Sequence, residues 1–266
     1  MADILIIALI GLCAGVLAGM FGIGGGVVMV PALLLALNFT LIRANGTSLA
    51  ALMMPVGIFA VIAYYKKDLL DVKVAAILAL GLLAGVLFGA RIALELPVKL
   101  LKQIYGVFLL GVCWDFFELQ TIIKKKFNNH NSTAAQDESA DKERKLPFYF
   151  LLPFGLFAGV LSGMFGIGGG LVIVPMLVTI MNFNTKKAVG TSLGALLLPV
   201  ALPGVIMYYN AGQINISDAA LLAAGLVIGS IIGAKITLSM SLTIVKRIYA
   251  LFLLAMSIEF IVSGFM

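Results

Sequence analysis

The chain has 266 residues, of which 62% are hydrophobic and 11% are charged, and its formal net charge is +6. Soluble domains are roughly 45–50% apolar and about 25% charged, so this composition excludes a soluble globular protein. Apolar stretches of about 20 residues recur, each long enough to cross a hydrocarbon layer about 30 Å thick. The chain is therefore predicted to be a polytopic, all-α membrane protein, whose positive charge indicates cytoplasmic lysines rather than a nucleic-acid partner.

The first predicted element, residues 4–37, is too long for one straight crossing and carries a glycine cluster in its middle. Each glycine costs a helix about 1 kcal/mol, and several of them followed by Pro31 predict a real break. Such irregular backbone at membrane depth is tolerated only where it is buried in protein or lines a cavity. Three apolar spans follow the broken element, over residues 44–65, 72–94 and 101–123.

The second half of the chain repeats the first without a gap. The octapeptide GMFGIGGG begins at residue 19 and again at residue 163, which is 144 residues later. The same offset relates GTSL at residues 46–49 to GTSL at residues 190–193, and Pro55 to Pro199. We therefore expect membrane repeats over residues 1–123 and 147–266, each with four to five helical segments including the broken one. A polar linker, residues 124–146, joins them.

The charges between the spans predict how the two repeats are oriented. If the broken segment crosses once, the flanking Lys and Arg residues divide almost evenly across the membrane. If it forms a re-entrant hairpin or crosses twice, Arg43, Lys99 and Lys102 face one side and the other flanking cations face the opposite side. Positive charge concentrates in cytoplasmic loops, which favours the second arrangement. It predicts inverted repeats with both termini outside and the linker in the cytoplasm.

The duplicated glycine cluster is the first candidate for a substrate site. Its backbone N–H groups lie beside the start of a half-helix, near Val27 and Leu171, where free donors and the helix-end charge favour an anion. The alternative is a hinge or close helix packing, whereas a dinucleotide fingerprint is excluded because the GxGxxG spacing fails at Val27. The candidate residues are Gly22, Gly24, Gly25 and Gly26, and in the second copy Gly166, Gly168, Gly169 and Gly170.

The two GTSL motifs each begin an apolar helix that Pro55 or Pro199 is expected to interrupt. Two interpretations of the hydroxyls are compatible: they cap the helix, or they donate hydrogen bonds to a bound oxyanion. Asn45 has no counterpart, because the equivalent residue is Val189. The hydroxyl-bearing candidates are Thr47, Ser48, Thr191 and Ser192.

Two further equivalent pairs are ionisable. Arg91 and Lys235 lie within predicted spans, where a charge is costly and indicates function by default. They either steer an anion toward the pore or extend to the lipid head groups. Asp115 and Glu259, late in the last helix of each repeat, either carry coupling protons or lie at the membrane interface.

The remaining side chains form no enzyme constellation. His130 is the only histidine and lies in the linker, so neither a metal site nor a cofactor is expected. Cys13 and Cys113 lie in apolar stretches as packing residues. The pairs Tyr64-Tyr65 and Tyr208-Tyr209 are expected at the membrane interface, because aromatic residues are enriched there.

The strings GVLAGMFGIGGGVVMVPALL with GTSLAALMMP, and GVLSGMFGIGGGLVIVPMLV with GTSLGALLLP, resemble the TauE/SafE family of sulfite and organosulfonate exporters. The resemblance covers the chain except residues 124–145. It implies a transporter in a bacterial or archaeal cytoplasmic membrane for small sulfur-containing anions such as sulfite, thiosulfate or sulfoacetate. The family signature falls on the glycine clusters, on Pro31 and on the GTSL motifs, with their copies. A thiol relay, proposed for a related thiosulfate-uptake branch, is not carried over, because both cysteines lie outside these motifs.

We therefore expect a secondary transporter, with export as the expected direction, that holds its anion between the two glycine breaks. A passive anion channel on the same pore, or a permease for another small carboxylate or oxyanion, is the alternative. A non-transporting scaffold is disfavoured, because a scaffold has no need of matched helix breaks. The expected partners are the small anion and membrane lipid, and the sequence leaves a homo-oligomer open.

Overall fold

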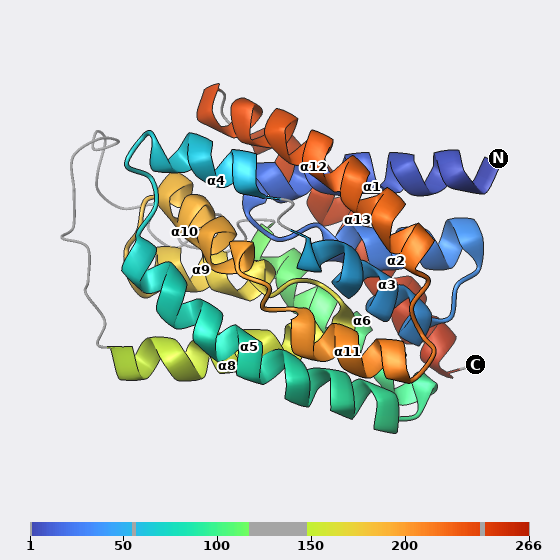
Figure 1. The fold of residues 1–266 in the computed structure, drawn as a ribbon. Coiled ribbons are helices and arrows are strands. Elements are labelled where there is room, and N and C mark those ends of the chain that lie inside the picture. Colours follow the sequence, from blue (N-terminus) through green and yellow to red (C-terminus); the bar gives the residue numbers. More distant parts are fainter. Residues whose placement is uncertain (1, 55–56, 117–147, 240–242, 266) are drawn as a thin grey trace, which may run out of the picture. The chain divides into compact units, whose positions relative to one another are not determined.

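The structure is a computed structural model that describes residues 2–54, 57–116, 148–239 and 243–265. Within these ranges the backbone forms twelve helices and no strand, so the predicted all-α class is confirmed (Figure 1). The first half contributes α1 (Ala2–Phe21), α2 (Gly26–Leu37), α3 (Leu41–Met53), α4 (Ile58–Tyr65), α5 (Val72–Glu95) and α6 (Val98–Phe116). The second half contributes α8 (Phe148–Phe165), α9 (Gly170–Thr179), α10 (Thr185–Leu197), α11 (Leu202–Asn210), α12 (Ile216–Ser239) and α13 (Thr243–Phe265). The linker prediction, residues 124–146, lies outside the described residues.

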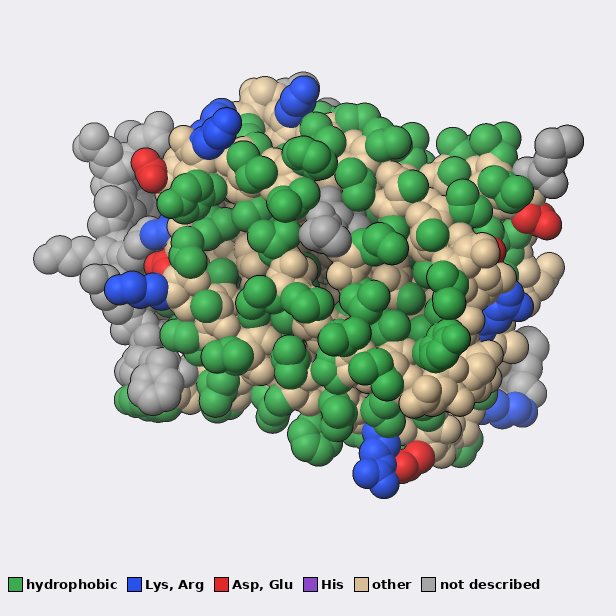
Figure 2. All heavy atoms as spheres, viewed as in Figure 1, with side chains coloured by type: hydrophobic (Ala, Val, Ile, Leu, Met, Phe, Trp, Pro, Cys, Tyr) green, Lys and Arg blue, Asp and Glu red, His purple; other side chains and the backbone are tan. Residues whose placement is uncertain are grey.

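Several helices are long and apolar enough to cross a membrane. Among the described residues, α1, α5 and α12 qualify alone, and two bent pairs, α3 with α4 and α10 with α11, each qualify together. These helices expose large hydrophobic side chains. On the face shown in Figure 2, hydrophobic side chains predominate and the charged side chains lie mostly toward the edges of that face. Such exposed apolar surface suits lipid rather than water, so the described helices fit an integral membrane protein.

The predicted span 44–65 and the corresponding segment of the second repeat, residues 190–209, are both bent rather than straight. The pair α3 and α4 bends by 51°, and the pair α10 and α11 bends by 50°. The residue before each proline, Met54 or Leu198, has an extended backbone with ψ near 150°. A proline disfavours the helical conformation of the residue before it, which explains why both helices end there. Both helices also begin earlier than predicted, at Leu41 and Thr185.

The chain divides into two compact units, and each unit takes helices from both halves of the sequence. The first consists of Met1–Leu96 with Lys145–Met240, and the second of Pro97–Arg144 with Ser241–Met266. The repeat boundary predicted from the sequence and the division into compact units are therefore different features of the chain.

The first unit is held by two equivalent helix pairs, α1 with α12 and α5 with α8. Gly11, Gly15 and Gly19 of α1 lie against the backbone of Leu222, Leu226 and Ser230, so these two helices run parallel. In the second pair, Gly155, Gly159 and Gly163 of α8 lie in the same way against Leu78, Leu82 and Val86. Small residues permit such close approach in membranes. Each pair joins the first helix of one half to the fifth helix of the other, and in Figure 1 α1 and α8 run in opposite directions.

The second unit pairs α6 with α13, which are equivalent helices of the two halves. Gly106 lies against Ser257 and Ile261, whereas Gly264 lies against Gln103 and Lys99, so the two helices are antiparallel. The Ser257 hydroxyl donates to the Gly106 carbonyl over 2.8 Å. The rings of Tyr105 and Phe260 stack with their centroids 5.0 Å apart.

Candidate functional site

The predicted helix breaks are present between α1 and α2 and between α8 and α9. Gly22, Gly24 and Gly25 have φ values of 70°, 82° and 83°. Their equivalents Gly166, Gly168 and Gly169 have φ values of 67°, 82° and 76°. Only glycine adopts this left-handed region readily, which explains why the sequence places glycines here. All six residues are buried, so the breaks face protein rather than lipid.

The two breaks lie directly against each other inside the first unit. A Cβ atom added to Gly26 would collide with the carbonyl oxygen of Gly166, and one added to Gly170 would collide with the carbonyl oxygen of Gly22. A Cβ atom on Gly24 would lie 3.5 Å from the Cα of Gly168. These contacts are backbone against backbone, which side chains at these positions would prevent.

The GTSL serines bind the opposite glycine break. The Ser48 hydroxyl donates to the Gly166 carbonyl over 2.8 Å, and the Ser192 hydroxyl donates to the Gly22 carbonyl over 2.8 Å. Both serines are fully buried. The structure makes neither of them a helix cap, because that position belongs to Thr40 in α3 and to Asn184 in α10.

The GTSL threonines lie within α3 and α10, and their hydrogen bonding differs. The Thr191 hydroxyl accepts a hydrogen bond from the Asp71 N–H over 3.0 Å. The Thr47 hydroxyl is buried, with no hydrogen-bond partner among the described residues. The helix-cap interpretation of the GTSL motif was therefore wrong for all four hydroxyl residues, because α3 and α10 begin one to two turns earlier than the sequence suggested.

Other buried side chains bind the carbonyls at the ends of α1 and α8. The Tyr208 hydroxyl donates to Gly163 over 2.9 Å, and the Tyr64 hydroxyl donates to Gly19 over 3.4 Å. Both tyrosines are fully buried, so the membrane-interface prediction was wrong for them, whereas Tyr65 and Tyr209 are exposed. The repeat was the only sequence feature that pointed to these tyrosines. It did not show which tyrosine of each pair turns inward, because adjacent residues on a helix point in different directions.

The carbonyls of Met20 and Met164 are bound by different residues in the two halves. The Asn45 amide donates to Met164 over 2.7 Å, and the Thr237 hydroxyl donates to Met20 over 2.9 Å. Asn45, which has no counterpart in the second half, therefore binds the end of α8. With the serines and tyrosines, these side chains occupy three carbonyls at each break.

The backbone N–H groups of the two breaks differ from these carbonyls in their hydrogen bonding. The first hydrogen bonds into α2 and α9 come from Val28 and Val172, which donate to the carbonyls of Gly25 and Gly169. Among the described residues, the structure gives no acceptor to the N–H groups of residues 24–27 or 168–171. The carbonyls of Gly22 and Gly166 are thus bound, whereas among the described residues these amides have no acceptor and lie beside a helix N-terminus, which carries positive partial charge.

A cavity lies where the two breaks meet, and Gly24 and Gly168 both line it. Its volume is about 40 Å³, whereas about 10–15 Å³ suffices for one water molecule. The remaining wall is mainly apolar, with the hydroxyl residues Ser162 and Ser230 as the exceptions among its lining residues. The cavity can therefore hold a small solute beside the backbone of Gly24 and Gly168.

Arg91 and Lys235, the predicted cations of the first unit, do not line this cavity. The Arg91 side chain is 68% exposed, and its Nε lies 2.9 Å from the Glu95 carboxylate one turn along α5. Lys235 is exposed on α12. Glu259 is half-buried on α13 in the second unit, and the Asp115 side chain lies outside the described residues. The structure thus brings together the glycines and GTSL residues, but not these charges.

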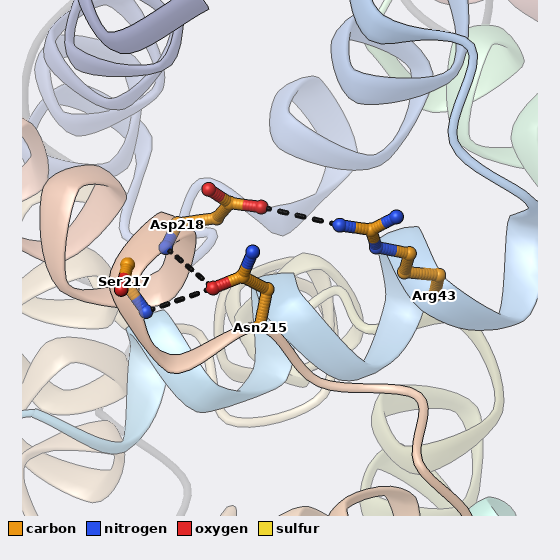
Figure 3. A network of polar contacts seen from close by, with 4 residues as sticks. All are labelled: Arg43, Asn215, Ser217 and Asp218. Atoms are coloured by element: carbon orange, nitrogen blue, oxygen red, sulfur yellow. Dashed lines mark hydrogen bonds and ion pairs between the residues drawn. The ribbon is translucent and has the colours of Figure 1, made fainter.

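An ion pair that the sequence analysis missed joins α3 to α12. Arg43 Nη2 lies 3.5 Å from Asp218 Oδ2, and Asn215 accepts from the N–H groups of Ser217 and Asp218 at the start of α12 (Figure 3). The Arg43 guanidinium also lies 4.1 Å from the centre of the Phe39 ring. Residues 43 and 218 are 175 positions apart, which is why no local pattern revealed the pair. The equivalent of Asp218 is Val74, so this ion pair has no copy in the other half.

The Ser48 hydrogen bond leads to a first prediction. Ser48→Ala leaves the buried Gly166 carbonyl without its donor, and a buried unsatisfied group costs about 1–3 kcal/mol. We expect a lower midpoint of thermal unfolding in detergent, and the same for Ser192→Ala. Ser239→Ala is a suitable control, because that exposed hydroxyl only bonds carbonyls of its own helix. Equal midpoints for Ser48→Ala and Ser239→Ala would contradict the assigned hydrogen bond.

Comparison with known proteins places the chain among membrane transporters. It is 26% identical to the probable membrane transporter protein YunE of Bacillus subtilis, over 97% of each chain. It is 28% identical to a probable membrane transporter protein of Methanocaldococcus jannaschii, over 89% of this chain and 87% of that one. A probable membrane transporter protein of Haemophilus influenzae is also 28% identical, over 96% and 97%. No solved structure matches the chain.

The apolar helices and these relatives together define the class of the protein, which is an integral membrane transporter. A model of the family described as sulfite exporter TauE/SafE matches residues 7–260. The chain therefore belongs to the TauE/SafE family, as the two signature strings predicted.

Proposed function

We propose that the protein is a secondary transporter that exports small sulfur-containing oxyanions, such as sulfite, thiosulfate or sulfoacetate, across the cytoplasmic membrane. One observation carries the proposal. At the cavity between the two glycine breaks, the carbonyls of Gly22 and Gly166 already accept hydrogen bonds, while the N–H groups at the starts of α2 and α9 have no acceptor among the described residues.

The electrostatics of this arrangement favour an anion. Each helix N-terminus carries a partial charge of about +0.5, and here two such ends lie beside one cavity. A negative ion that leaves water needs new hydrogen bonds, and the unbonded backbone amides supply them. The carbonyls of Gly22 and Gly166, which could otherwise bind a cation, already accept hydrogen bonds from the serine hydroxyls. Anion binding therefore needs no lysine or arginine in the cavity.

The helix directions support an inverted-repeat transporter. The equivalent helices α6 and α13 are antiparallel, and α1 and α8 enter the first unit from opposite ends (Figure 1). The serine hydrogen bonds are reciprocal between the halves, as expected when a pseudo-two-fold axis relates them. Transporters of this kind place the substrate between inverted repeats at broken helices. We accordingly propose inverted repeats with both termini outside and the linker in the cytoplasm.

The charged residues outside the cavity have proposed secondary roles. Lys235 would raise the local concentration of anions at one mouth, and Arg91 would contribute less because Glu95 partly neutralises it. Steering of this kind weakens with ionic strength. Asp115 and Glu259 would carry the coupling protons.

Flux through reconstituted protein tests the proposal. Purified protein in liposomes should move sulfite, thiosulfate or a sulfonate much faster than potassium or an uncharged solute of similar size. Collapse of accumulation when the proton gradient is dissipated indicates a coupled carrier, whereas an ohmic conductance indicates the alternative anion channel. Absence of oxyanion flux in folded, correctly inserted protein would contradict the proposal.

A further inference from the structure

The cavity between the glycine breaks is symmetric in its backbone but not in its hydroxyl groups. Gly24 and Gly168 are equivalent across the repeat, as are Leu52 and Leu196. Ser162 on α8, in contrast, corresponds to Ala18 on α1, which lines the same cavity. The second half therefore supplies a hydroxyl where the first half supplies only a methyl group.

The other hydroxyl in the wall, that of Ser230, donates to the Val227 carbonyl of its own helix over 2.9 Å. Ser162 differs from it. The residue is only 2% exposed, yet among the described residues the structure shows no hydrogen bond from its hydroxyl to a protein acceptor. A serine hydroxyl can donate one hydrogen bond, so this group can bind a solute that enters the cavity it lines.

Ser162 lies close to the second glycine break. Its backbone carbonyl accepts from the Gly166 N–H over 2.8 Å. Its Cβ lies 3.7 Å from the point that a Cβ on Gly169 would occupy, at the start of α9. A solute bound by the amides of the second break would therefore lie beside the Ser162 hydroxyl.

We propose that Ser162 is a specificity-determining residue that donates a hydrogen bond to one oxygen of the bound anion. This inference rests on the proposed function. The two breaks supply one set of amide donors each, and Ser162 supplies a third donor from one side. Three donor directions match the three oxygens of a sulfonate or sulfite, whereas a carboxylate has only two oxygens. Polar sites of this kind discriminate strongly against ligands that leave one of their groups unpaired.

The test compares methanesulfonate with acetate, two anions that share a methyl group and differ in the number of oxygens. Binding is measured by calorimetry on purified full-length protein, for the wild type, Ser162→Ala and Ser162→Cys. Because a hydrogen bond to a charged group contributes about 1.5–3 kcal/mol, we expect both variants to bind methanesulfonate about tenfold or more weakly. Acetate binding should change far less. Alanine and serine have nearly equal volumes, so Ser162→Ala removes the hydrogen bond with little change in packing, and Ser162→Cys tests the same bond with a weak donor.

Ser239→Ala is the control, since that exposed hydroxyl bonds only carbonyls of its own helix and does not line the cavity. We expect it to retain the preference for methanesulfonate. An unchanged ratio of the two affinities in Ser162→Ala, with wild-type thermal stability, would overturn the role of Ser162 and leave the proposed function standing. A wild-type protein that binds no oxyanion at all would overturn both.

Discussion

Gly26→Ala and Gly170→Ala are each expected to abolish transport and to lower the free energy of unfolding by about 3 kcal/mol. Both residues begin a helix, where alanine is ordinarily more favourable than glycine. The added Cβ atoms, however, would collide with the carbonyl oxygens of Gly166 and Gly22, which belong to the opposite break. Backbone atoms cannot move aside as a side chain can, and overpacking typically costs 1–3 kcal/mol or more. Flux in liposomes and thermal unfolding in detergent measure the two effects.

Gly212→Ala is the control for these variants. Gly212 has a φ of 69°, and a Cβ atom there would meet nothing within 4 Å. Only the left-handed backbone penalty of about 1–2 kcal/mol remains, and transport should survive. If Gly26→Ala retains both wild-type flux and wild-type stability, the two breaks do not meet as described.

Gly85→Ala and Gly229→Ala are expected to destabilise the protein, whereas Gly111→Ala is expected to stabilise it. A Cβ on Gly85 would collide with the Leu156 carbonyl and lie 2.8 Å from the Gly159 Cα. A Cβ on Gly229 would collide with the Leu12 carbonyl in the equivalent helix pair. Separating these close pairs forfeits the packing that associates helices in membranes, which we expect to cost about 2 kcal/mol or more.

Gly111→Ala is expected to raise the stability, because a Cβ at residue 111 would meet nothing within 4 Å. Replacing a helical glycine by alanine in open space gains about 0.5–1 kcal/mol through the lower backbone entropy of the unfolded chain. Unfolding midpoints in one detergent compare the three variants directly. A Gly85→Ala midpoint at or above that of Gly111→Ala would contradict the close contact of α5 with α8.

Much of this architecture was predictable because the membrane imposes simple constraints. The apolar lengths predicted helices, and the glycines at residues 22–26 predicted a break that the backbone confirms. Met54 and Leu198 precede prolines, so the bends of the spans also follow from local sequence. In these cases the residues that cause the structural feature all lie within one short segment of the chain.

The interactions between distant segments were not predictable in the same way. Ser48 and Gly166 are 118 positions apart, so nothing local showed that the serine binds the opposite break. Tyr64 was expected at the membrane surface, because its type is common there, but tertiary packing buries it against α1. Asp218 and Arg43 likewise meet only through the fold. The repeat showed that equivalent residues occur in both halves, but it did not show which residues they contact.

Amide chemical shifts of selectively ¹⁵N-labelled glycine test the central claim most directly, because they report on the proposed donors themselves. Titration of the purified wild-type protein with sulfite should shift the amide protons of Gly24 to Gly26 and Gly168 to Gly170 downfield, as N–H groups shift when they bind an oxyanion. Gly111 and Gly212 should not move. Saturable sulfite transport with no shift at either glycine break would contradict the account.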